Sequence, residues 1–139
     1  MPDMRPGRDK ERQVGPHRVV IEPPDLLYLK LDGDVELEHI KAFLEAVAEF
    51  PAEVHILRDA RKSRIVTAAA REYMLKTMPK GKVVSFISFG APFHARTVIS
   101  MLAKAIRLLR HDSPVVGFTS TEAEARAWID KVRASRRNG

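Results

Sequence analysis

Short apolar runs alternate along this chain with longer stretches in which apolar residues recur every three or four positions. The short runs are rich in β-branched residues, which is typical of strands, and the longer spacing is typical of amphipathic helices. The predicted strands are residues 18–22, 26–31, 54–58, 82–89 and 115–119. The predicted helices begin near Leu37, Val66, Pro92 and Thr121. We therefore expect a single α/β domain with a five-stranded mixed sheet flanked by four helices, in the order ββαβαβαβα.

Turn, stop and capping signals fall between these elements. Pro23-Pro24-Asp25 predicts a turn that joins the first two strands into a hairpin. Asp32-Gly33-Asp34 is expected to end the second strand, and Thr121 with Glu124 forms a capping-box pattern. The last helix carries Trp128 on its apolar stripe, so we expect this side chain to be largely buried and its truncation to alanine to cost about 3–5 kcal/mol. The residues expected to face inward on the third helix are Val98, Met101, Leu102, Ala105, Ile106 and Leu109.

The net charge of +6 lies at the two ends of the chain. Residues 1–17 are rich in proline, glycine and charge, so we expect a disordered N-terminal tail, with a domain at 18–134 and a basic tail at 135–139. Residues 19–57 carry nine acidic and two basic side chains, whereas 58–110 carry two acidic and twelve basic ones. Two explanations fit this segregation: solvated helix faces that differ in sign, or a docking surface for a charged partner.

Several classes of protein are disfavoured by composition. The chain has no cysteine, which excludes disulfides and thiolate metal sites, and its histidines lack metal-ligand spacing, so no metal or cofactor is expected. No apolar run is long enough to span a bilayer, and the first residues contain no apolar signal segment, so we expect a cytoplasmic protein. Peripheral membrane contact and a homodimer stay open. Nucleic acid is a poor candidate partner because the basic block lacks interleaved aromatic residues.

Four motifs resemble a known family. They are LxGDVxLExIxxFL from Leu31, a strand that ends in Asp59, a strand–GxPFHxR–helix unit from Gly90, and FTSTEAEARAWI from Phe118. In layout the chain is similar over roughly 18–134 to SpoIIAA-like proteins of the STAS superfamily, named after sulphate transporters and anti-anti-sigma factors. The resemblance implies a STAS-like mixed sheet flanked by helices and a role in protein binding rather than catalysis. Some relatives with the related CRAL-TRIO fold imply lipid binding.

The resemblance has one clear departure. Anti-anti-sigma factors carry a phosphorylatable serine in an Asp-Ser-Ser/Thr-Gly-Leu turn, whereas this chain reads DARKSRI from Asp59 and lacks the glycine. Ser63 and Thr67 are the nearby hydroxyls. A phosphate on either would lie among cations and near a helix N-terminus, which makes both candidates for phosphorylation. The alternative is that both are ordinary loop or cap residues.

Polar residues also follow the ends of the predicted strands, where ligands bind in open α/β sheets. Asp59, His94 and Arg96 could transfer a proton or hold an anion there, although the favoured explanation is that His94 packs in its turn and Arg96 pairs with an acid. The residues expected to bind an acidic protein surface are Arg61, Lys62 and Arg64, extended by Arg96 and Arg107.

Three classes of function remain. The leading one is a noncatalytic regulatory or protein-interaction module, as the resemblance implies. The second is a carrier or sensor of a small anionic or lipid-like ligand bound between the sheet and its helices. The third is a small enzyme that uses the strand-end cluster, for which a hydrogen-bonded pair of Asp59 and His94 would be the sign.

Overall fold

The computed structural model describes residues 10–109 and 114–138 and, within them, contains six strands and four helices. The strands are β1 (Lys10–Val14), β2 (His17–Glu22), β3 (Leu26–Val35), β4 (Val54–Val66), β5 (Val83–Phe89) and β6 (Val115–Thr119). The helices are α1 (Leu37–Ala48), α2 (Ala68–Thr77), α3 (Phe93–Leu109) and α4 (Glu122–Asn138). The predicted α/β domain with a mixed sheet and four helices is thus confirmed, with one additional strand.

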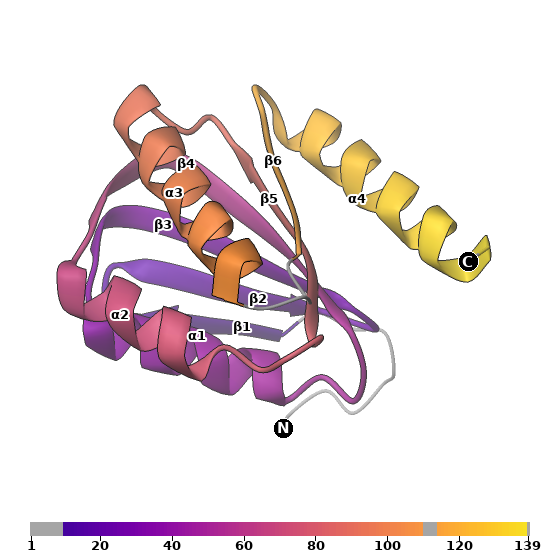
Figure 1. Cartoon of the computed structure of the whole chain (residues 1–139), viewed down its shortest axis with the longest axis horizontal. Coiled ribbons are helices and arrows are strands. Elements are labelled where there is room, and N and C mark those ends of the chain that lie inside the picture. Colours follow the sequence, from indigo (N-terminus) through magenta and orange to yellow (C-terminus); the bar gives the residue numbers. More distant parts are fainter. Residues whose placement is uncertain (1–9, 110–113, 139) are drawn as a thin grey trace.

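The six strands lie side by side in chain order. β1, β2 and β3 pair antiparallel, and β3, β4, β5 and β6 pair parallel. Each parallel connection passes through one helix and steps in the same direction, so the usual right-handed crossover places α1, α2 and α3 on one face of the sheet. Of the four described helices, α4 alone covers the other face (Figure 1).

Two apolar clusters correspond to these two layers. The larger one joins β2, β3 and β4 to α1 and α2, and includes Leu29, Phe43 and Val47. The smaller one lies under α4, where Ala125 and Ile129 pack on Leu57, Ile87 and other strand residues. Each face of the sheet therefore carries its own layer of apolar side chains, because successive side chains along a strand point to opposite faces.

The sixth strand comes from the segment expected to be disordered. β1 pairs with β2 through a tight turn at Gly15, whose φ of 57° is a conformation that glycine adopts without strain. The predicted tail is therefore wrong for residues 10–17, and residues 1–9 lie outside the described part of the chain. At the other end α4 continues to Asn138, so residues 135–138 extend a helix rather than forming a separate tail.

The strand predicted at 54–58 is longer than expected, and no loop follows it at 59–65, because β4 continues to Val66. Its second half pairs with the end of β3, and the register shifts around Asp32 and Gly33. Gly33 has a φ of 92°, which lets β3 bend at the predicted break instead of ending there. Both faces of this two-stranded extension meet solvent over several residues, so its sequence carries charges instead of the apolar alternation of a strand.

Two further predictions concern side-chain orientation. On α3, Leu102 and Ile106 face inward as expected, but the Met101 side chain is 65% exposed. The side chain of Leu109 lies outside the described residues. Trp128 is half-buried rather than largely buried, and packs at the edge of the smaller cluster.

Candidate functional site

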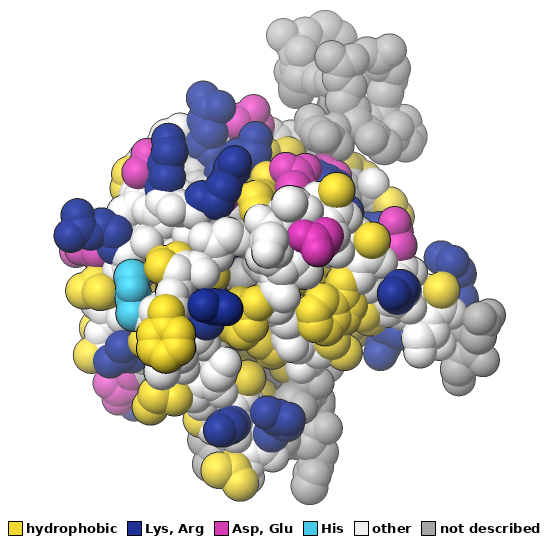
Figure 2. Space-filling model, turned by 90° about the horizontal axis from the view of Figure 1, so that it is seen from above, with side chains coloured by type: hydrophobic (Ala, Val, Ile, Leu, Met, Phe, Trp, Pro, Cys, Tyr) yellow, Lys and Arg dark blue, Asp and Glu magenta, His cyan; other side chains and the backbone are white. Residues whose placement is uncertain are grey.

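The residues predicted to bind a partner or ligand do not form one site. All of them except Arg107 fall into three places around the end of the sheet where β4, β5 and β6 finish. Figure 2 looks at the molecule from that side and shows Lys and Arg side chains spread over the surface, with apolar side chains exposed between them.

The first place is built on Asp59 and Arg61. The guanidinium donates to both carboxylate oxygens, at 3.0 and 2.7 Å, and the ring of Phe89 lies 5.4 Å from it. Burial alone would raise the pKa of Asp59, but the hydrogen bonds from Arg61 outweigh it and lower that pKa. Lys62 is exposed beside this pair and borders an open hollow of about 280 Å³. Because Arg61 is already paired, Lys62 is the freer cation of the two.

The two candidate phosphorylation residues lie just beyond this pair. Ser63 is buried, and its hydroxyl donates to the carbonyl oxygen of Ala60 at 2.9 Å. Thr67 is the N-cap of α2, where its hydroxyl oxygen accepts from the backbone N–H of Ala70. Both hydroxyls therefore serve the local fold, and phosphorylation of either stays a prediction.

The second place lies beneath the first turns of α2 and α3. Arg64 and His94 border a hollow of about 50 Å³ there, together with Arg58 and Arg71. His94 is exposed, and Asp59 is engaged by Arg61 and does not border this hollow. The pair of Asp59 and His94 that would indicate proton transfer is therefore not formed. Sequence reasoning missed Arg58, although it lies two residues after Ile56 and therefore shares the inward face of β4 with it.

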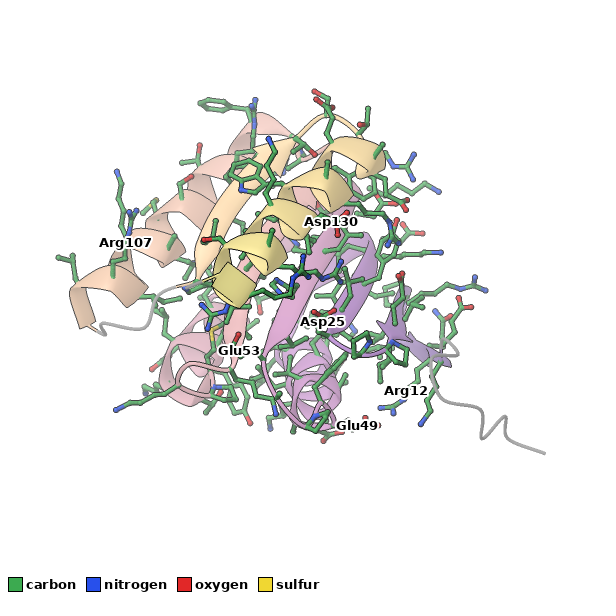
Figure 3. All side chains as sticks on the ribbon, turned by 90° about the vertical axis from the view of Figure 1, so that its right-hand side faces the viewer. Arg12, Asp25, Glu49, Glu53, Arg107 and Asp130 are labelled. Atoms are coloured by element: carbon green, nitrogen blue, oxygen red, sulfur yellow. The ribbon has the colours of Figure 1, made fainter. Side chains whose placement is uncertain are left out.

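The third place is a groove of about 460 Å³ between α3 and β6, called the α3–β6 groove below. It is lined by Phe93, Arg96, Thr97, Ser100, Met101, Lys104 and Phe118. Phe93 is 76% exposed, and the guanidinium of Arg96 lies 6.0 Å from the centre of its ring. Arg107 lies further along the outer side of α3, near its C-terminal end (Figure 3). The exposed apolar side chains are the feature that the helical pattern did not predict.

A set of ion pairs fixes α4 to the strands. Arg126 donates to both carboxylate oxygens of Glu22, at 3.0 and 2.8 Å, and Arg133 donates to both oxygens of Asp25, at 3.1 and 2.7 Å. Arg136 pairs with Glu53 near the end of the helix; Figure 3 labels Asp25 and Glu53 on this side of the molecule. Much of the basic C-terminal charge is therefore neutralised within the fold rather than available to a partner.

One group of possible metal ligands occurs among the described residues. One ligand atom from each of Glu36, Glu38 and His39 lies within 4.8 Å of the others. Nδ1 of His39 already accepts from the backbone N–H of Glu36, as a capping box at the start of α1 requires. The cluster is therefore explained by helix capping. In the described part of the chain, no helix has the length and apolar character needed to cross a membrane.

Comparison with known proteins gives one kind of likeness. No protein-family model matches the chain, and no curated protein matches it. Among solved structures it is similar to an uncharacterised protein of the DUF3478 family with a SpoIIAA-like fold from Shewanella loihica PV-4. The two share 14% sequence identity with a TM-score of 0.48, over 92% of this chain and 98% of that one.

Proposed function

We propose that this chain is a noncatalytic protein-interaction module and that its docking surface is the α3–β6 groove. The observation that carries the proposal is the exposure of Phe93 and Met101, at 76% and 65%, on one helix face beside a groove. Large apolar side chains gathered at a hollow are typical of surfaces that another molecule covers.

The charges of the groove indicate the kind of partner. Arg96 and Lys104 line it, and none of the described acidic residues does. Protein interfaces combine apolar anchors with a charged rim that selects the partner and speeds association. A partner that inserts apolar side chains next to Phe93 and Met101 and presents carboxylates to Arg96 and Lys104 fits both features.

The edge of the sheet adds a second contact surface. β6 pairs only with β5 among the described strands, so its other edge is open beside the groove. An open strand edge offers backbone hydrogen-bonding groups to a partner. The basic residues Arg61, Lys62 and Arg64 lie on the β3–β4 extension outside the groove, where we propose that they steer the approach of an acidic surface.

The noncatalytic part of the proposal rests on how the polar residues are used. Asp59 is neutralised by Arg61, and His94 lies in a different hollow, which no carboxylate of the described chain lines. We propose the cytoplasm as its location, on the ground that the chain contains no cysteine.

The test uses the absence of cysteine, which makes any introduced thiol unique. Met101→Cys, labelled with a benzophenone, is irradiated in native extract, and Ala48→Cys at the exposed end of α1 is the matched control. We expect a discrete cross-linked adduct from position 101. The adduct should disappear in the double variant Arg96→Glu with Lys104→Glu, and its yield should fall as the salt concentration rises. Identical adducts from both positions, or an adduct insensitive to the charge reversal, would contradict the proposal.

A further inference from the structure

Arg58 is a buried cation to which no described acidic residue is paired. Its side chain lies inside the domain, with a residue exposure of 4%, on the face of the sheet that α1, α2 and α3 cover. Among the described residues no carboxylate forms an ion pair with it, although six other arginines form such pairs. An isolated charge in an apolar interior is strongly unfavourable unless a counter-ion or hydrogen-bond acceptors reach it.

The hydrogen bonds of Arg58 within the described part of the chain leave most of its N–H groups free. One Nη atom donates to the hydroxyl of Ser88 at 3.3 Å, and the ring of Phe86 lies 5.5 Å from the guanidinium carbon. No fully buried side-chain nitrogen or oxygen in the described region lacks a hydrogen-bond partner. The N–H groups that Ser88 does not accept must therefore border open space. Burial lowers the pKa of Arg58 to about 10, which leaves it charged at neutral pH.

The open space next to Arg58 has an apolar side. A cavity of about 50 Å³ lies between the sheet and the helices, and Arg58 is the single charged residue of the described chain in its lining. A second apolar hollow of about 30 Å³ lies beneath α2 and α3. Met74, Met78, Phe86 and Ile99 line both, so the two hollows are neighbours, and Arg58 borders the larger one.

The space also has a cationic side. Arg58 borders the hollow beneath the first turns of α2 and α3 as well, where Arg64, Arg71 and His94 lie. None of the acidic residues that the structure describes lines this hollow. The N-terminal ends of the two helices add positive potential. An anion that enters from this side meets only positive or neutral groups among the described residues before it reaches Arg58.

We propose that Arg58 binds the carboxylate of a small ligand whose apolar tail lies beneath α2 and α3. A planar carboxylate matches the fork of N–H donors in a guanidinium, and such a bidentate pair would supply the missing counter-charge. The cavity is smaller than the roughly 150 Å³ that accommodates benzene, so the tail is a short chain. Met74 and Met78 are half-buried and adaptable, which lets the space lengthen as the tail grows.

The experiment measures binding of a homologous series to the full chain by titration calorimetry: acetate, butanoate, hexanoate and octanoate. We expect the affinity to rise about fourfold for each methylene that enters the apolar space, and then to level off before octanoate. Hexanol and hexylamine, which lack the carboxylate, should bind at least about tenfold more weakly than hexanoate. Equal binding of hexanol, or no binding of any acid, overturns the proposal.

Two variants separate a ligand-binding role from a structural one. Arg58→Met keeps the approximate volume and removes the charge, so we expect hexanoate binding to fall at least about tenfold while the melting temperature without ligand stays equal or rises. Arg137→Met, at the exposed end of α4, is the matched control and should bind as the parent does. Unchanged hexanoate affinity in Arg58→Met overturns the proposal. If that variant does not fold, Met74→Phe provides the test, because the larger side chain fills the apolar space. It should weaken the binding of hexanoate more than the binding of acetate. Equal effects on the two affinities overturn the proposal.

Discussion

Replacing Gly117 by alanine should destabilise the protein only while Trp128 is present. Gly117 lies in β6 directly under the indole ring, and a Cβ atom there would come within 2.3, 2.5 and 2.7 Å of three ring carbons of Trp128. Carbon atoms in contact normally lie about 3.5–4.0 Å apart, so the ring would have to retreat by more than about 1 Å. Because Trp128 belongs to α4, this movement shifts the helix away from the apolar strand residues on which it packs. We expect a loss of about 1–3 kcal/mol, as for other overpacked sites.

Removing the ring should cost a comparable amount by a different mechanism. A tryptophan side chain buries about 150–250 Å² when it is fully covered, and Trp128 is half-buried. Half of that area at about 25 cal/mol per Å² gives a loss of about 2–3 kcal/mol for Trp128→Ala. This value is below the roughly 3–5 kcal/mol expected from the sequence, because solvent reaches part of the ring.

The double variant decides between packing and an intrinsic effect of alanine in β6. The clash disappears in the Trp128→Ala background, so there Gly117→Ala should change the free energy of unfolding by only a few tenths of a kcal/mol. Urea titrations followed by far-UV circular dichroism measure all four proteins without relying on tryptophan fluorescence. If Gly117→Ala costs the same with and without the indole, the contact is not the cause and the reasoning is refuted.

Three further outcomes can be measured. Burial lowers the pKa of His17, whose ring accepts a hydrogen bond from one backbone N–H and bonds to one backbone carbonyl oxygen. As the pH falls, the unfolded chain therefore binds a proton at this histidine before the folded chain does. The free energy of unfolding should fall as the pH drops below about 6.5. Urea midpoints between about pH 7.5 and 5 should show a shallower slope for His17→Gln, and equal slopes would contradict this. Arg133→Met should lower the free energy of unfolding by about 1–3 kcal/mol in the same titration. The substitution removes two charge-assisted hydrogen bonds between α4 and the partly buried Asp25. A loss below about 0.5 kcal/mol would show that the pair behaves as a solvated surface ion pair. Reversing Arg61, Lys62 and Arg64 to Glu should leave the melting temperature nearly unchanged and slow association with an acidic partner at low salt, and an unchanged association rate would remove these residues from the binding step.

The sequence predicts elements well where one physical signal dominates. The helix at Phe93–Leu109 and the capping box of Thr121 and Glu124 are as expected, and Glu124 accepts from the backbone N–H of Thr121 at 3.1 Å. Sequence-based prediction of strands fails where a segment becomes a strand only because it pairs with residues distant in the chain. The second half of β4 is a strand because β3 lies beside it, and its charged residues give no local sign of that.

The candidate site was predicted in part. Arg96 lies in the α3–β6 groove, but Met101 was placed on the inward face, since a helical pattern gives the spacing of apolar residues and does not say which stripe remains uncovered. Arg58 was missed because a charge at the end of a strand is ordinarily solvated. Its burial becomes evident only when α2 and α3 are in place above it.

The placement of α4 has a consequence for biosynthesis. Every described strand of the sheet precedes Glu122 in the chain, so all six have been synthesised before the helix that covers their second face exists. Until this last segment leaves the ribosome, Leu57, Ile87 and their neighbours present an uncovered apolar surface, which is the kind of surface that aggregates or attracts a chaperone. A message that stopped translation at Thr121 would yield a complete sheet with one face permanently bare.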